Sequence, residues 1–132
     1  MGQFIGIEAG GTKFVCAYGN SPDTLSERTV IPTETPEITM KAVGDFIGRA
    51  QKKTDILAIG VGTFGPLDPD PHSKTYGYIT TTPKKHWANY DFAGYLHREF
   101  ELPVGFDTDV NAAALGEYRR GAAQGLSDFI YI

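Results

Sequence analysis

Residues 4–18 have the sequence FIGIEAGGTKFVCAY, in which two glycines separate two apolar runs. Apolar, β-branched and aromatic residues on both sides of a glycine turn are typical of a β-hairpin. A third run, residues 28–31 (RTVI), follows a Gly-Asn-Ser-Pro-Asp turn. The first part of the chain therefore predicts an antiparallel meander of three strands.

Helical and strand patterns follow the meander. Thr35 and Pro36 are typical of an N-cap and a first helical residue, and the apolar stripe behind them predicts a helix that ends near Lys53. The members of that stripe are Ile38, Val43, Phe46 and Ile47. Residues 56–61 form a continuous apolar run, which favours a strand buried on both faces of a sheet.

The second half of the chain begins with an irregular stretch. Residues 67–89 lack a regular period and predict a long loop, a feature that is often functional. Asp91 can cap a second helix, and residues 103–106 predict a short buried strand. A helix from about 110 to 120 and an apolar run at 129–132 complete the pattern.

This order of elements, β-β-β-α-β-α-β with a crossover helix, indicates an α/β fold of the actin-like or RNase H-like ATPase lobe type. Such a lobe contains a mixed sheet with an antiparallel β-meander and crossover helices. A length of 132 residues allows one compact domain. We therefore expect residues 1–132 to be the N-terminal lobe of a longer protein, with a second lobe beginning near residue 127.

The composition narrows the class of ligand. The formal net charge is −4, and the 12 basic residues are spread along the chain, so the sequence gives no footprint of a nucleic-acid or membrane-surface binder. A single cysteine, Cys16, cannot form an internal disulfide and is expected in the core. No apolar segment approaches membrane-spanning length. We expect a cytoplasmic protein with a small neutral substrate.

The turn between the first two strands is the first candidate site. Gly10 and Gly11 let the backbone bring N–H groups against phosphate oxygens, and Thr12 and Lys13 can add a hydroxyl and a cation. Glu8, at the end of the first strand, could hold magnesium beside those phosphates. The alternative is an ordinary hairpin turn. A Walker loop and a dinucleotide fingerprint are both excluded by the spacing and by the strand that follows.

The second candidate site is the segment Asp107-Thr108-Asp109-Val110-Asn111, where a buried strand leads into a helix. Ligands of open α/β sheets bind at the carboxyl ends of strands. Asp109, next to the helix start, could accept the proton of a sugar hydroxyl while that oxygen attacks the γ-phosphorus of ATP. The alternative is that the two aspartates only cap the helix.

The third candidate site is the loop of residues 63–89. It contains Gly65, three threonines at 80–82, and Trp87, which together offer hydroxyl groups and an aromatic wall for a neutral sugar. The three histidines are too scattered for a metal site. No zinc is therefore expected in this segment.

Three segments in register resemble the ROK family of sugar kinases and related repressors. They are residues 8–13 (EAGGTK), 59–66 (IGVGTFGP) and 107–117 (DTDVNAAALGE). The resemblance covers nearly the whole chain in the right order. It implies that ATP and Mg²⁺ are the cofactors and a hexose the substrate, with a homodimer as the assembly. Any zinc site of the family would lie beyond residue 132.

The resemblance also assigns roles to individual residues. It implies that Asp109 is the catalytic base and that Gly65, Thr81 and Thr108 contact the sugar. The EAGGTK wording is similar to that of the ROK fructokinases, so D-fructose is the favoured substrate and fructose 6-phosphate the product. Glu8 stands where most members have Asp, and Thr108 where many have Asn.

Other functions remain open at this point. Within the kinases, the sugar could be glucose, mannose or an N-acetylated hexosamine. A sugar-sensing repressor of the same family would resemble a kinase behind a helix-turn-helix segment, whereas this sequence starts directly with its first strand. A non-catalytic, actin-like binding module is the third alternative.

Overall fold

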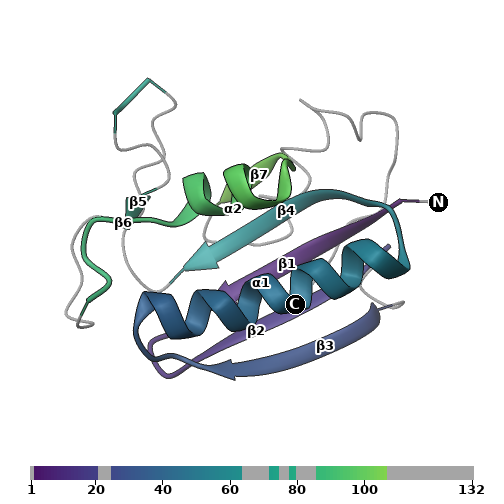
Figure 1. The fold of residues 1–132 in the computed structure, drawn as a ribbon, viewed down its shortest axis with the longest axis horizontal. Coiled ribbons are helices and arrows are strands. Elements are labelled where there is room, and N and C mark those ends of the chain that lie inside the picture. Colours follow the sequence, from purple (N-terminus) through teal and green to yellow (C-terminus); the bar gives the residue numbers. More distant parts are fainter. Residues whose placement is uncertain (1, 21–24, 64–71, 75–77, 80–85, 107–132) are drawn as a thin grey trace.

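The computed structural model describes residues 2–20, 25–63, 72–74, 78–79 and 86–106, and its fold is shown in Figure 1. The elements are β1 (Gln3–Ala9), β2 (Lys13–Gly19), β3 (Leu25–Pro32), α1 (Pro36–Lys53), β4 (Ile56–Thr63), β5 (Tyr78–Ile79), β6 (Tyr90–Asp91), α2 (Phe92–Phe100) and β7 (Val104–Phe106). The predicted meander, crossover helix, buried strand and second helix are all confirmed. The elements predicted after residue 106, and the start of a second lobe, lie outside the described residues.

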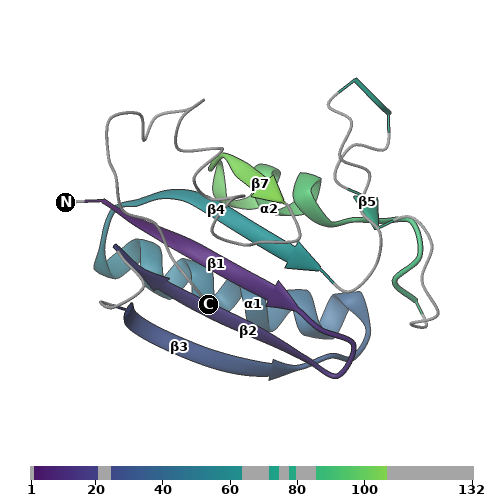
Figure 2. The ribbon, with the colours of Figure 1, turned by 180° about the vertical axis from the view of Figure 1, so that it is seen from behind.

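The main sheet is mixed and has the order β3-β2-β1-β4-β7. β1 pairs antiparallel with β2, and β2 with β3, whereas β1 and β4, and β4 and β7, are parallel. Parallel neighbours need a crossover connection, which α1 and α2 supply. Figures 1 and 2 show both helices on the same face of the sheet. This arrangement confirms the predicted α/β lobe.

The core lies between the sheet and α1. Ile7 pairs with Cys16 and Ile5 with Tyr18, so these four side chains lie on one face, and the Tyr18 ring packs 5.8 Å from that of Phe46 in α1. The α1 side of this core contains Met40, Val43, Phe46, Ile47 and Ala50, all buried. Cys16 is fully buried, as predicted, and burial raises the pKa of its thiol to about 12.

Two details of α1 differ from the prediction. Ile38 is 54% exposed and does not belong to the buried stripe, in which Met40 takes part instead. Thr35 occupies the N-cap position, but its side chain makes no capping hydrogen bond. The hydroxyl of Thr39 accepts a bond from the backbone N–H of Glu34 (2.7 Å), so the buried Thr39 stabilises the start of the helix from within.

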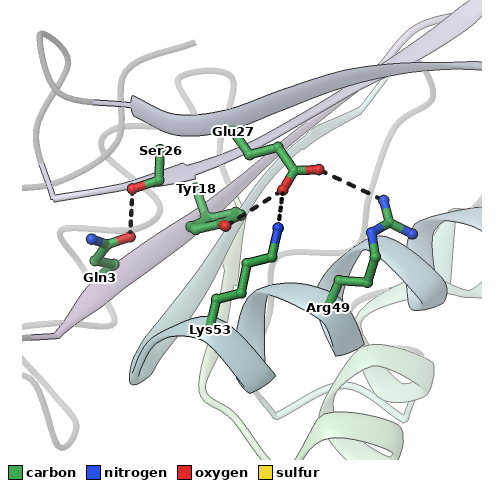
Figure 3. Close-up of polar contacts among 6 residues, drawn as sticks. All are labelled: Gln3, Tyr18, Ser26, Glu27, Arg49 and Lys53. Carbon is green, nitrogen blue, oxygen red and sulfur yellow. Dashed lines mark hydrogen bonds and ion pairs between the residues drawn. The ribbon is translucent and has the colours of Figure 1, made fainter.

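A cluster of charges joins α1 to the edge strand β3 (Figure 3). The carboxylate of Glu27 lies 3.3 Å from the ammonium of Lys53 and 3.8 Å from the guanidinium of Arg49. The hydroxyl of the buried Tyr18 donates to the same carboxylate at 3.5 Å. Such exposed ion pairs each contribute little, so the helix is held mainly by its apolar face.

The second helix begins as the sequence predicted. The Asp91 carboxylate accepts a bond from the backbone N–H of Gly94 (3.0 Å) and one from the guanidinium of Arg98 (2.8 Å). A short element that was not predicted precedes it, because Ile79 pairs with Tyr90 in a two-stranded antiparallel ladder, β5-β6. Neither described helix is long and apolar enough to cross a lipid bilayer.

The glycines of α1 offer a test of this packing. A Cβ on Gly48 would meet no atom within 4 Å, so Gly48→Ala should raise the free energy of unfolding by about 1 kcal/mol, the difference in helix propensity. Gly44→Ala is the matched control, because its Cβ would lie 3.3 Å from the Tyr95 hydroxyl and should lose part or all of that gain. Urea unfolding measures both. Equal gains for the two variants would contradict the packing of α1 on α2.

Candidate functional site

The parallel strands of the sheet end at a common edge. Ala9 of β1 pairs with Thr63 of β4, and Val61 of β4 pairs with Phe106, the last residue of β7. The carboxyl ends of β1, β4 and β7 are therefore neighbours. The diglycine turn follows β1 at this edge, and the chain continues from β7 into Asp107. Such edges are where open α/β sheets bind ligands.

The diglycine turn closes a tight hairpin. The N–H of Gly10 donates to the carbonyl of Lys13 (2.9 Å), and a Cβ on Gly10 would lie only 2.8 Å from that carbonyl oxygen. Glycine at this position is thus required by the turn itself. By contrast, a Cβ on Gly11 would meet no atom within 4 Å. Nothing in the described structure requires glycine at position 11, and the space next to it is open.

The turn also contains backbone donors without a partner among the described residues. Within residues 2–20, 25–63, 72–74, 78–79 and 86–106, the N–H groups of Gly11 and Thr12 donate to no acceptor, and both residues are exposed. Adjacent unsatisfied N–H groups form a concavity that suits an anion. The exposed side chain of Lys13 adds a positive charge beside them. The predicted group of Gly10, Gly11, Thr12 and Lys13 is therefore brought together.

The exposed carboxylate of Glu8 lies on the face of the sheet that α1 does not cover. Glu8 pairs with Val15 and alternates with Ile7, which faces α1. The described part of the chain contains no group of three or more His, Cys, Asp or Glu side chains that could hold a metal ion. Magnesium typically uses one or two carboxylates together with substrate phosphates, so Glu8 fits as one contributor.

The position of Trp87 corrects a prediction. We expected it to form an aromatic wall for a sugar, but its side chain is completely buried. Its ring lies 5.5 Å from that of Phe14 and 5.3 Å from that of Tyr90, and its Nε1–H donates to the carbonyl of Glu34 (2.8 Å). Burial of a large aromatic ring in the core removes much apolar surface from water, which stabilises the fold more than exposure at a sugar site would.

A contributor that the sequence did not reveal is Thr33. It directly follows β3, is buried, and makes two hydrogen bonds to the diglycine turn, one from its hydroxyl to Gly10 and one from its N–H to Thr12. A threonine between a strand and a helix N-cap is an ordinary feature of a sequence. Only the pairing of β2 with β3 brings it to the turn.

The other predicted site residues lie outside the described residues. They are Asp109, Thr108, Thr81 and Gly65. A groove of about 570 Å³ between α1 and α2 is lined by residues such as Glu37, Tyr90 and Tyr95, and none of the predicted site residues that the structure describes lines it. The edge formed by the strand ends is therefore the candidate site, rather than this groove.

Comparison with known proteins shows which family the chain is similar to. A family model described as the ROK family matches residues 4–132. A fructokinase of Pediococcus pentosaceus is 48% identical over 126 residues, which are 96% of this chain and 42% of that protein. A glucokinase of Streptomyces coelicolor is 28% identical over 133 residues, covering 100% of this chain and 40% of that protein. The chain thus spans about two fifths of the curated relatives it matches.

A solved structure is similar over the same region. It is a ROK family glucokinase from Streptomyces griseus in complex with glucose and AMPPNP, with a TM-score of 0.66 and 29% identity. The match covers 93% of this chain and 38% of that one. The similarity in fold and sequence thus extends over nearly the whole of this chain.

The two glycines of the turn should respond differently to substitution. Gly10→Ala forces its Cβ against the Lys13 carbonyl and should lower the free energy of unfolding by about 1–3 kcal/mol, the cost of local backbone strain. Gly11→Ala adds its Cβ in open space and should change stability by about 0.5 kcal/mol at most. Thermal unfolding of both variants measures the difference. A larger loss for Gly11→Ala than for Gly10→Ala would show that the turn is built differently.

Proposed function

The chain belongs to the ROK family, and from this premise we propose that the complete gene product is an ATP-dependent hexose kinase that converts D-fructose to fructose 6-phosphate. One observation carries the proposal most directly. The turn after β1 presents two backbone donors and a lysine at the edge where three parallel strands end. An anion bound at that edge would lie on the same side of the sheet as the carboxyl end of β7, which Asp107 follows in the sequence.

ATP would bind with its phosphates at the diglycine turn. The N–H groups of Gly11 and Thr12 would donate to phosphate oxygens, Gly10 would shape the turn, and Lys13 would balance part of the charge. Glu8 would hold Mg²⁺ near the same oxygens, directly or through water. When bound, the nucleotide would supply the phosphoryl group and the metal ion would neutralise part of its charge. The related glucokinase was solved in complex with AMPPNP, which supports ATP as the nucleotide.

A residue in the segment after β7 would activate the sugar hydroxyl. We assign Asp109 as the general base, which accepts the proton of the 6-hydroxyl as that oxygen attacks phosphorus. Gly65, Thr81 and Thr108 would bind the sugar through backbone and hydroxyl groups. Support for this assignment comes from the strand register, since β7 ends at Phe106, three residues before Asp109 and beside β4.

Fructose is favoured over glucose by the comparison of relatives. The fructokinase of Pediococcus pentosaceus is 48% identical to this chain, against 28% for the glucokinase of Streptomyces coelicolor. Both matches cover nearly the whole chain, so the difference is not an effect of length. A location in the cytoplasm, where ATP is available, and a homodimer remain predictions.

A panel of hexoses tests the substrate. ADP release by the complete gene product is measured with a coupled assay. The kcat/KM should be highest with D-fructose, and the rate should fall to background without Mg²⁺. Glucose, mannose and N-acetylmannosamine are the comparison sugars. A higher kcat/KM with one of these sugars would identify that sugar as the substrate instead of fructose. If no sugar stimulates the release of ADP, the proposed kinase activity is refuted.

Substitution of Asp109 tests the base. Asp109→Asn keeps the size of the side chain and removes its ability to accept a proton, so kcat should fall by roughly 10²–10⁴-fold while sugar affinity changes little. Asp107→Asn is the matched control, since it removes the neighbouring carboxylate from the same segment. Steady-state kinetics and equilibrium sugar binding report the two quantities separately. An unchanged kcat in Asp109→Asn, or a greater loss in Asp107→Asn, would overturn the assignment.

A further inference from the structure

Thr33 joins the two sides of the diglycine turn through two hydrogen bonds. Its Oγ1 donates to the carbonyl of Gly10 (2.8 Å), and its backbone N–H donates to the carbonyl of Thr12 (3.0 Å). We propose that Thr33 is a positioning residue for the phosphates of ATP and acts through the backbone of this turn. The inference rests on the function proposed above and adds to it a residue that does not touch the nucleotide.

Planar geometry explains how a carbonyl bond can orient a phosphate donor. In a trans peptide the C=O of one residue and the N–H of the next lie in one plane and point in opposite directions. The bond from Thr33 to the Gly10 carbonyl therefore fixes the direction of the Gly11 N–H. That N–H has no acceptor in the described part of the chain, and Gly11 is exposed to solvent. Without the hydroxyl, the peptide between Gly10 and Gly11 loses this restraint on its orientation.

The freedom of this peptide is unusually large because both of its residues are glycines. Glycine populates more backbone conformations than any other residue, so an unrestrained diglycine loses the most conformational entropy when it binds a ligand. Gly10 has one further restraint, its own N–H bond to Lys13 at 2.9 Å. Thr33 supplies the restraint on the other side of that residue, through the Gly10 carbonyl.

Thr33 can support the turn only if its own position is fixed, and its neighbours fix it from two directions. The buried hydroxyl of Thr39 donates to the carbonyl of Pro32 (3.1 Å) and accepts from the N–H of Glu34 (2.7 Å). The Nε1–H of the buried Trp87 donates to the carbonyl of Glu34 (2.8 Å). The residues before and after Thr33 are thereby anchored to α1 and to the aromatic core.

The test removes the hydroxyl and keeps the shape. Thr33→Val in the complete gene product retains the backbone bond to Thr12 but loses the one to Gly10. The loss of one hydrogen bond should raise the KM for ATP and the Kd of a non-hydrolysable ATP analogue about fivefold. The KM for the sugar should stay within about twofold, because its proposed contacts lie elsewhere. Thr33→Ser keeps the hydroxyl and should restore the ATP affinity.

Tyr18→Phe is the matched control. It also removes one hydroxyl from a buried side chain, but Tyr18 lies near the end of β2 opposite to the turn, where its hydroxyl bonds to Glu27 of β3 (Figure 3). Its ATP affinity should equal that of the wild type. Should Thr33→Val fail to fold, Thr33→Ala provides a second variant without the hydroxyl, and the same shift is expected.

The outcomes separate this inference from the proposed function. A Thr33→Val protein that unfolds at lower urea concentration but binds the ATP analogue like the wild type would show that Thr33 is only structural. An equal loss of affinity in Thr33→Ser and Thr33→Val would also overturn the role of the hydroxyl. A wild-type protein that binds no ATP analogue would refute the kinase itself, and the inference with it.

Discussion

The register between β1 and its parallel neighbour β4 is the constraint on which the rest of the structure depends. Because side chains alternate along a strand, the pairing of Ile7 with Val61 directs both residues toward α1 and leaves Glu8 on the opposite face. A slip by one residue would bury the carboxylate and expose the isoleucine. The same register aligns Ala9 with Thr63, so the diglycine turn begins where β4 ends. Core packing and the position of the site are thus specified by one set of pairs.

This division of faces lets the protein keep polar groups without weakening its core. The helices cover one face of the sheet, and Ile5, Phe14 and Tyr18 pack there without exposure to solvent (Figures 1 and 2). Glu8 and Lys13 are exposed on the strands that carry this core. An ionised group is costly to bury, so a site at the strand ends avoids a penalty that a site within the core would incur. The fold therefore allows the proposed anion site to lie beside the buried core rather than within it.

The sequence predicted the elements well and the environment of individual side chains less well. The meander, α1 and β4 followed from local patterns, because strand and helix periods depend on residues close in sequence. Ile38 and Trp87 were assigned wrongly, since burial depends on which element packs against a side chain, and the pattern alone does not reveal it. The diglycine turn was found from its residue types. Thr33 was missed, because its partners lie 21 and 23 residues away and become neighbours only through β2–β3 pairing.

The backbone and the side chains of the candidate site have separate tasks. Phosphoryl transfer depends on positioning and charge stabilisation more than on covalent chemistry by the protein, so a kinase benefits from donors that do not move when the substrate arrives. Backbone N–H groups meet this need only if their peptide planes are fixed. Glycines permit the close approach of a ligand but do not provide that rigidity. In this chain the rigidity comes from the residue that follows β3. The buried Thr33 bonds to the carbonyls of Gly10 and Thr12, and the residues on either side of it are tied to α1 and to Trp87. The flexible diglycine turn, which would contact the phosphates, is thereby combined with a rigid support from Thr33.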